Sequence, residues 1–195
     1  VAGKGIDNQG VFKRLRGPKG TEVTVGIQRN GEPELLEFLI VRDKIPLYAL
    51  DAAYMIDNRL GYVKLSRFSS TATAEVAMAI DSLNELGMKD LILDLTGNSG
   101  GYLNQAHLLA DLFLDDEKLV VYTEGRAFTR QDLNAEFKGN FEKGKLVIMI
   151  DGGSASASEI VAGAVQDWDR GLLVGRRSYG KGLVQKGYNL PDQSA

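Results

Sequence analysis

Two different patterns of hydrophobic and polar residues follow one another along the chain. The first predicts a short helix that ends at Gly17 and Pro18, and then two strands on either side of a turn at Asn30-Gly31. A helix and a hairpin of this size bury too little apolar surface to form a core alone. We therefore do not expect residues 1–43 to fold as a separate domain.

From residue 61 onward, short apolar runs alternate with helical patterns. Residues 71–87 carry apolar side chains at helical spacing, and Gly87 is typical of the residue after a helix C-terminus. The polar stretch 126–145 is expected to be a loop with a short helical piece. The alternation of apolar runs and helical patterns predicts an α/β fold with a largely parallel sheet and helices packed against it. One expected strand, GYVKLSRF, alternates between apolar and polar residues. The other expected strands are of the kind buried on both faces: LILDL, LVVYT, KLVIMID and GLLVG. The other expected helices are 102–114 and 157–168.

The composition narrows the chemistry that the chain can carry. Its net charge is −3 and it has no block of basic residues, which argues against nucleic acid as a main partner. The absence of cysteine excludes disulfides, a thiol nucleophile and a cysteine zinc site. His107 is the single histidine, so a two-histidine metal site cannot form, and its place beside an apolar helical stripe indicates a structural role.

No apolar run reaches the roughly 18 residues of a membrane span. The chain starts at Val1 rather than Met, so the lack of a visible signal sequence proves little.

Two junctions between an expected strand and an expected helix carry candidate chemistry: LDLTGNSGGYL and MIDGGSASASEI. In the second junction, Ser154, Ser156 and Ser158 alternate immediately before a helix. One interpretation is structural, because Ser156 and Glu159 have the spacing of a capping box. The other is catalytic, because the free N–H groups and the dipole at a helix N-terminus stabilise an oxyanion beside an exposed hydroxyl. The residues alone leave both interpretations open.

A serine hydroxyl needs a neighbouring base to act as a nucleophile. With histidine nearly excluded, lysine is the remaining candidate type, provided that burial lowers its pKa of about 10.4 by about three units, which is roughly 4 kcal/mol. Lys181 is the candidate, because glycines on both sides allow close packing before the strand-like LVQ; the alternative is a lysine in an exposed turn. In the first junction, Gly100 and Gly101 allow backbone N–H groups to approach a ligand closely. The alternatives there are a plain turn and a phosphate cradle, although neither phosphate-binding glycine motif is complete.

Three segments together resemble the carboxy-terminal processing proteases, also called tail-specific proteases. They are LDLTGNSGGYL, DGGSASASEIVAGAVQD and GRRSYGKGLVQ, in this order, and the resemblance extends over nearly the whole chain. In that family a Ser-Lys dyad hydrolyses peptide bonds near the C-termini of protein substrates. The resemblance implies a layered α/β core of the crotonase/ClpP type with a largely parallel sheet, and it implies neither a cofactor nor a metal.

The resemblance also implies roles for individual residues. The nucleophile attacks the peptide carbonyl, the lysine acts as general base, and a glutamine orients the lysine amine. Two backbone N–H groups form the oxyanion hole, one of them from either glycine of the first junction. The residues are, for catalysis, Ser156, Lys181 and Gln185; for the oxyanion hole, Ala157, Gly100 and Gly101; and, as supporting acidic residues, Glu159 and Asp167. Two positions depart from the family pattern: Thr96 stands where arginine is frequent, and Ser99 where proline is frequent.

On the same resemblance, residues 1–43 correspond to the C-terminal half of a PDZ domain, residues 44–60 to a linker, and residues 61–195 to the protease core. The opening strands of the PDZ domain would precede Val1 and further core strands would follow Ala195, so we expect a fragment of a longer enzyme, with wording around its motifs most like members from Bacteroides-type bacteria. The implied partners are protein or peptide substrates bound by their C-terminal tails, and a homo-oligomer is compatible. The implied location is the periplasm or the cell envelope.

Two alternative functions stay open at this stage. Some members of the family fold bind retinoids without protease activity, so a non-catalytic ligand-binding protein on the same scaffold is one alternative. A crotonase-type acyl-CoA enzyme is the other, because it uses the same pair of oxyanion N–H groups without needing a lysine base. The intact set of Ser156, Lys181 and Gln185 favours the peptidase.

Overall fold

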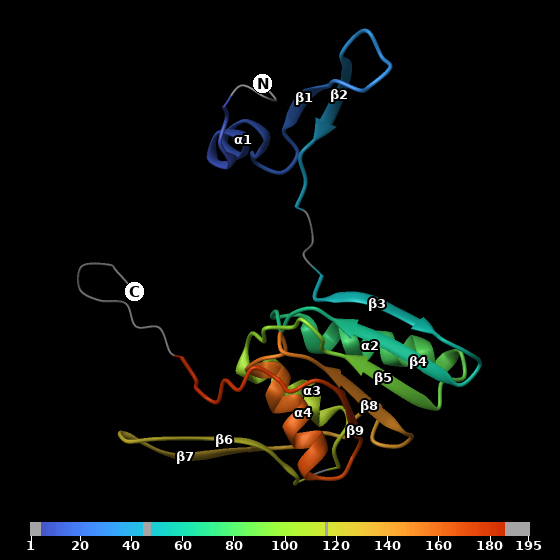
Figure 1. Ribbon diagram of the computed structural model, residues 1–195, viewed down its shortest axis with the longest axis vertical. Helices are drawn as coiled ribbons and strands as arrows, with labels where there is room; N and C mark the ends of the chain where they lie inside the picture. The colour runs from blue at the N-terminus through green and yellow to red at the C-terminus, as the bar shows by residue number, and fades with distance from the viewer. Residues whose placement is uncertain (1–4, 45–47, 116, 186–195) are drawn as a thin grey trace. The chain divides into compact units, whose positions relative to one another are not determined.

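The computed structural model describes residues 5–44, 48–115 and 117–185, and the chain divides into two units, Val1–Leu47 and Tyr48–Ala195 (Figure 1). The two strands of the first unit pair antiparallel. The elements of the first unit are α1 (Asn8–Leu15), β1 (Glu22–Ile27) and β2 (Leu36–Val41).

One arginine joins the helix of the first unit to its hairpin. Arg42 Nε donates to Leu15 O at 2.8 Å, and Arg42 Nη1 donates to Glu22 O at 2.8 Å. None of the described side chains of this unit is buried, and Leu39 is 63% exposed. The predicted helix and hairpin are confirmed, and they bury no core of their own.

The second unit is built on a five-stranded sheet with the strand order β3-β4-β5-β8-β9. β3 pairs antiparallel with β4, and the other neighbouring strands pair in parallel. The predicted α/β fold with a largely parallel sheet is confirmed. The strands are β3 (Leu50–Met55), β4 (Leu60–Leu65), β5 (Asp90–Asp94), β8 (Leu146–Ile150) and β9 (Leu172–Gly175).

Burial alternates along the central strands of this sheet. Val63, Leu93 and Ile148 are each 0% exposed and stand in register on β4, β5 and β8. Tyr62 and Ile92, which point to the other face, are only partly buried. The alternation expected of GYVKLSRF is confirmed, whereas the expectation that LILDL and KLVIMID are buried on both faces is wrong. Right-handed crossovers between strands that follow one another across a sheet place all the helices on one face. These helices are α2 (Ala72–Glu85), α3 (Leu103–Asp111) and α4 (Ala157–Asp167).

The run LVVYT is not part of the main sheet. It belongs to β6 (Leu119–Gly125), which pairs antiparallel with β7 (Phe128–Asn134) as a separate hairpin. The stretch 126–145, expected to be a loop with a helical piece, supplies β7 and turns instead. The strand was missed because β7 is exposed along most of its length, and an exposed strand needs no alternation of apolar and polar residues.

The base of this hairpin is fixed to two helices. Trp168 Nε1 donates to Leu119 O at 2.8 Å, and His107 Nε2 donates to Asn134 O at 2.6 Å. His107, on α3, is 9% exposed. Its structural role, expected from the sequence, is thus the bond that joins α3 to β7.

Residues 44–60, expected to be a linker, contain β3. Ser66 N–H donates to Ala49 O at 2.9 Å, and Ala49 is 0% exposed, so this segment is already part of the second unit. The pattern LDAAYM carries too few β-branched residues to indicate a strand from the sequence. Residues 45–47 of the expected linker and 186–195 of the expected core lie outside the described residues.

β5 and β8 are parallel neighbours, so the turns that follow them lie side by side at the carboxyl edge of the sheet. These turns are the two junctions that the sequence singles out. Within the described ranges, no helix combines the length and the hydropathy that a transmembrane segment needs.

Candidate active site

The turn between β8 and α4 holds Ser156 in an uncommon backbone conformation. Its φ is 54° and its ψ is −111°, and such a conformation costs a residue other than glycine about 1–3 kcal/mol. Its N–H donates to Glu159 Oε2 at 2.8 Å, which is the glutamate half of the capping box at the start of α4. The capping interpretation is therefore correct, and it does not exclude the catalytic one. A strained serine between a strand and a helix is also the geometry of a nucleophile elbow.

The three alternating serines have different surroundings. Ser154 and Ser158 are both 0% exposed. Ser154 Oγ donates to Leu95 O at 2.7 Å, and Ser158 Oγ donates to Asn98 O at 2.9 Å. Ser156, between them, is only partly buried and lines a pocket. Two serines thus join the two turns of the carboxyl edge, and the middle one is left to face a ligand.

The turn after β5 passes directly against Ser156. A Cβ placed on Gly100 would lie 2.9 Å from Ser156 Cβ and 3.0 Å from Ala157 N, and Gly100 has a φ of 102°. Any other residue at this position would therefore push the two turns apart. On the other side of the contact, a Cβ on Gly153 would lie 2.9 Å from Gly97 Cα.

Two backbone N–H groups are available beside Ser156. Gly101 and Ala157 both line the pocket, and neither N–H group has a hydrogen-bond acceptor among the described residues. The Gly100 N–H, by contrast, donates to Asn98 Oδ1 at 2.9 Å. Of the two glycines that the sequence left open, Gly101 is the one whose N–H a ligand can use.

Glu159 connects this turn to the segment that carries Lys181. Its Oε2 accepts the N–H groups of Ser156 at 2.8 Å and Lys181 at 2.9 Å. Its Oε1 accepts Ser178 Oγ at 2.7 Å and Gly180 N–H at 2.6 Å. Burial raises the pKa of Glu159, but these hydrogen bonds outweigh burial and hold the pKa below its usual value. One ionised carboxylate therefore fixes the backbones of the candidate nucleophile and the candidate base beside each other.

A pocket of about 300 Å³ brings the candidate catalytic residues together. Ser156, Lys181 and Gln185 all line it, and Lys181 Nζ donates to Gln185 Oε1 at 3.3 Å. Most of the remaining lining is apolar, which suits a peptide with apolar side chains. The apolar lining residues include Leu103, Val121, Ile160, Leu183 and Val184.

The side chain of Lys181 is exposed. The sequence argument expects burial to lower the pKa of its amine, since only a neutral amine accepts a proton. The described residues do not provide that burial. The lysine stands at the edge of the pocket rather than inside it.

The structure does not bring every expected residue to the pocket. Asp167 is exposed at the last position of α4, about 16 Å from Ser156 along the helix axis. Among the described residues that line the pocket, neither Asp167 nor His107 is present. A role for Asp167 beside the nucleophile therefore has no support in the geometry.

Sequence reasoning missed the polar residues that hold the turn after β5. Asn98 is 0% exposed, and its Nδ2 donates to Leu65 O at 2.9 Å while its Oδ1 accepts Gly100 N–H. Asp151 Oδ1 accepts Gly97 N–H at 2.8 Å. Asparagine and aspartate commonly bond to backbone groups in turns, so their positions beside the glycines were the available signal.

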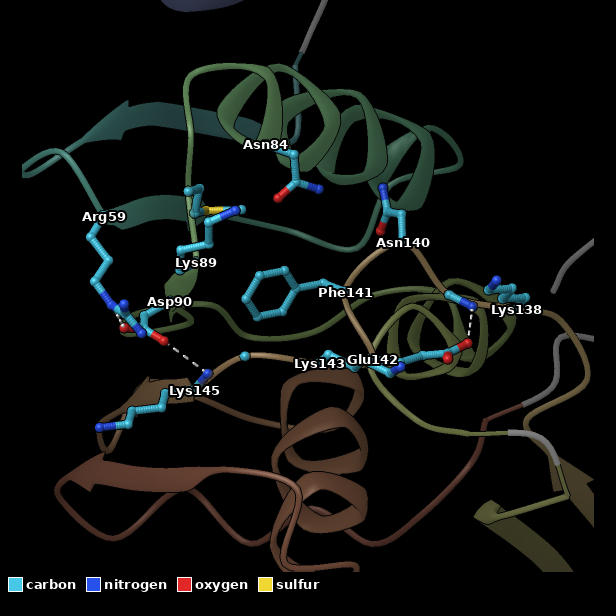
Figure 2. A pocket seen from close by; sticks show the side chains of 13 residues that line it. Arg59, Asn84, Lys89, Asp90, Lys138, Asn140, Phe141, Glu142, Lys143 and Lys145 are labelled. Atoms are coloured by element: carbon cyan, nitrogen blue, oxygen red, sulfur yellow. Dashed lines mark hydrogen bonds and ion pairs between the residues drawn. The ribbon is translucent and has the colours of Figure 1, made fainter.

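A larger hollow, of about 690 Å³, lies at the opposite edge of the sheet, where β5 and β8 begin (Figure 2). Met88 and Phe141 are its buried residues. None of the described residues that line it is a serine or a threonine, so it offers no second candidate hydroxyl nucleophile. Elsewhere in the described chain, too, no group of three His, Cys, Asp or Glu residues is placed to hold a metal ion. The basic residues around the hollow are Arg59, Lys89, Lys138, Lys143 and Lys145.

The lowered pKa of Glu159 predicts how the site responds to acid. A carboxyl group whose folded pKa is depressed stabilises the fold above its unfolded pKa, near 4.5, and this contribution is lost as the pH falls through the folded pKa. We expect Glu159→Gln to lower the melting temperature at pH 7 by more than at pH 3, because the stabilisation that comes with the lowered pKa of Glu159 declines once the pH falls below the unfolded pKa. Thermal unfolding of both proteins across this range is the measurement. An equal difference at both pH values would contradict the role of the ionised carboxylate.

The sequence of this chain is similar to those of known proteins. The family model described as Peptidase family S41 matches residues 59–195. The chain is 41% identical over 183 residues to a carboxyl-terminal-processing protease of Synechocystis, covering 92% of this chain and 42% of that protein. It is 35% identical over 191 residues to the carboxy-terminal processing protease CtpA of Bacillus subtilis, covering 98% of this chain and 40% of that protein. The chain thus spans about two-fifths of the length of these relatives.

Solved structures show the same fold. The photosystem II D1 C-terminal processing protease superposes with a TM-score of 0.69 at 29% identity, over 91% of this chain and 49% of that one. A putative S41 protease from Bacteroides fragilis superposes with a TM-score of 0.65 at 18% identity, over 88% of this chain and 50% of that one.

Proposed function

Because the chain belongs to peptidase family S41, we propose that it acts as a serine endopeptidase of the carboxy-terminal processing type. The observation that carries this proposal is the pocket lined by Ser156, Lys181 and Gln185, with Ser156 and Lys181 held on one carboxylate of Glu159. The substrates are proteins cleaved near their C-termini. The reaction is acyl transfer, and it needs neither a metal nor a cofactor.

In the first step, the neutral amine of Lys181 takes the proton from the Ser156 hydroxyl as Oγ attacks the peptide carbonyl carbon. The carbonyl oxygen becomes an oxyanion, and the N–H groups of Ala157 and Gly101 donate to it. Each such donor lowers the barrier by about 3 kcal/mol. The Lys181 ammonium then gives its proton to the leaving amine as the C–N bond breaks. Water then attacks the acyl carbon while the same amine takes a proton from it, and the bond to Ser156 Oγ breaks as Oγ receives that proton from the ammonium.

The exposure of Lys181 sets a condition on this mechanism. The amine must lose contact with water before it can act as a base near neutral pH. The apolar lining of the pocket supports a simple route: a bound peptide fills the roughly 300 Å³ beside Lys181 and covers its amine. Gln185 Oε1, which accepts from Lys181 Nζ at 3.3 Å and also lines the pocket, holds the amine beside the bound peptide.

The remaining parts of the proposal rest on resemblance. Residues 1–43 act as the second half of a PDZ domain that binds the substrate's C-terminal tail, and the chain is a fragment of a longer enzyme of Bacteroides-type origin. Residues 1–43 have exposed apolar side chains, such as that of Leu39, and these support the proposal that other segments of a longer protein cover them. The location is the periplasm or the cell envelope, and a homo-oligomer is compatible. The curated relatives named above come from bacteria.

A serine-directed fluorophosphonate probe tests the proposed function. We expect one adduct, on Ser156, identified by mass spectrometry of the digested protein, and no adduct on Ser154 or Ser158, which are buried. The exposed amine of Lys181 favours a second candidate, a non-catalytic ligand-binding protein on this scaffold, and that candidate predicts no adduct. Binding of coenzyme A without an adduct would instead support an acyl-CoA enzyme.

A further inference from the structure

A second lysine, on β4, binds the turn that carries Gly101. Lys64 Nζ donates to three acceptors: Asp94 Oδ1 at 3.0 Å, Thr96 O at 2.6 Å and Thr96 Oγ1 at 2.7 Å. An ammonium group has three N–H donors, so all of them are used. The side chain of Lys64 is 20% exposed and that of Asp94 is 8% exposed, so the ion pair is largely removed from water.

We infer that Lys64 is a positioning residue, whose ammonium group fixes the turn after β5 so that the Gly101 N–H is presented to the oxyanion. This inference rests on the proposed function. Lys64 itself does not line the pocket. With its three donors engaged, it is bound as a cation, whereas Lys181 is exposed and donates to Gln185.

Two separate sets of hydrogen bonds join neighbouring residues of β4, Lys64 and Leu65, to the turn. Asp94 Oδ1, which binds Lys64, also accepts the Thr96 N–H at 2.7 Å, so the first residues of the turn are held at both N–H and C=O. Leu65, the next residue of β4, accepts from Asn98 Nδ2, and Asn98 Oδ1 accepts the N–H of Gly100. Two consecutive residues of one strand therefore hold the turn at its beginning and at its middle.

The remaining side of the turn is held by the neighbouring turn, through Ser154 and Ser158, which donate to Leu95 O and Asn98 O. These contacts do not reach Thr96. Among the described residues, two side chains from outside the turn bind Thr96: Asp94, which ends β5, and Lys64, which comes from the neighbouring strand β4. Removal of Lys64 should therefore let the beginning of the turn move while leaving the contacts of α4 in place.

The test combines turnover with hydrogen exchange in the whole protein. For Lys64→Met we expect kcat to fall about 10- to 100-fold, because a displaced donor loses much of its effect, while KM changes by less than about threefold. We expect amide exchange in residues 95–101 to become faster. Lys64→Arg, whose guanidinium can reach both Asp94 and the Thr96 carbonyl, should recover most of kcat.

A matched control removes an ion pair between the same two strands at their other end. Arg59 Nε lies 2.7 Å from Asp90 Oδ2, at the starts of β4 and β5 (Figure 2). Arg59→Met should leave kcat and the exchange of residues 95–101 unchanged. If Lys64→Met does not fold, because it leaves the Asp94 carboxylate without its cation, the double variant Lys64→Met with Asp94→Asn removes both charges. That variant should fold and show the same loss of kcat.

The two readouts separate the possible outcomes. Unchanged exchange in residues 95–101 of Lys64→Met would overturn the inference whatever the activity. Faster exchange with wild-type kcat would overturn the positioning role. If the wild-type protein showed neither hydrolysis nor probe labelling, the proposed function would be contradicted. The exchange data would still decide whether Lys64 holds the turn.

Discussion

Replacing Ser156 with alanine should abolish peptide hydrolysis, lowering kcat/KM about 10⁴- to 10⁶-fold. The variant loses the oxygen that attacks the carbonyl and keeps everything that binds substrate, including the Gly101 and Ala157 N–H groups and the Glu159 contacts. The assay is the release of C-terminal fragments from an unfolded protein with an apolar tail, followed by mass spectrometry. The fold should be kept, since the capping bond from the backbone N–H to Glu159 does not depend on the serine side chain.

The neighbouring serines provide matched controls. Ser154→Ala and Ser158→Ala each leave a buried carbonyl, that of Leu95 or Asn98, without its hydroxyl donor, and we expect each to destabilise the fold by about 1–3 kcal/mol. Both keep the nucleophile, so folded protein should still react with the probe. Hydrolysis that survives in Ser156→Ala, or probe labelling that survives there, would remove Ser156 from the mechanism.

Replacing Lys181 with methionine should lower kcat about 10³- to 10⁴-fold, because the general base is lost. The same change should alter the free energy of unfolding by no more than about 0.5 kcal/mol, because the side chain is exposed. A large loss of activity without a loss of stability indicates that a residue takes part in catalysis and not in folding. Denaturant titration and initial-rate measurements on the same preparation provide both values.

Lys181→Arg sharpens this prediction. It keeps the positive charge and the length of the side chain, but a guanidinium stays protonated and cannot accept the serine proton. We therefore expect it to be as inactive as Lys181→Met. As a control, Lys143→Met, an exposed lysine beside the opposite edge of the sheet, should keep wild-type kcat. A Lys181→Arg variant with wild-type kcat would show that charge, and not proton transfer, is what the position supplies.

The strands and helices that surround the site were predictable because each has a strong local signal. The apolar runs at β5 and β8 and the serine-to-glutamate spacing at the start of α4 lead directly to two turns at one edge of a parallel sheet. The strands β3 and β7 were not predictable, since β3 has small residues and β7 is exposed. Their pairing depends on backbone hydrogen bonds to a neighbouring strand, which leave little pattern in the sequence.

The sequence indicated which residues of the site carry out the chemistry, but it did not indicate which residues hold them in place. The motifs point to Ser156 and Lys181, but nothing in the spacing indicates that Lys64, over 30 positions before the end of the turn it binds, holds Thr96. Such long-range contacts appear only once strands are paired. For Lys181 the sequence left a buried base and an exposed turn as alternatives, because a lysine between two glycines fits a buried segment as well as an open one, and the structure shows the exposed side chain.

The strained backbone of Ser156 means that thermal stability and turnover favour different residues at that position. Glycine adopts positive φ without the steric cost that serine bears, so it is the residue that heat resistance alone would choose. Directed evolution of this chain for tolerance to heat, without a screen for cleavage, would therefore drift towards folded proteins that no longer cut.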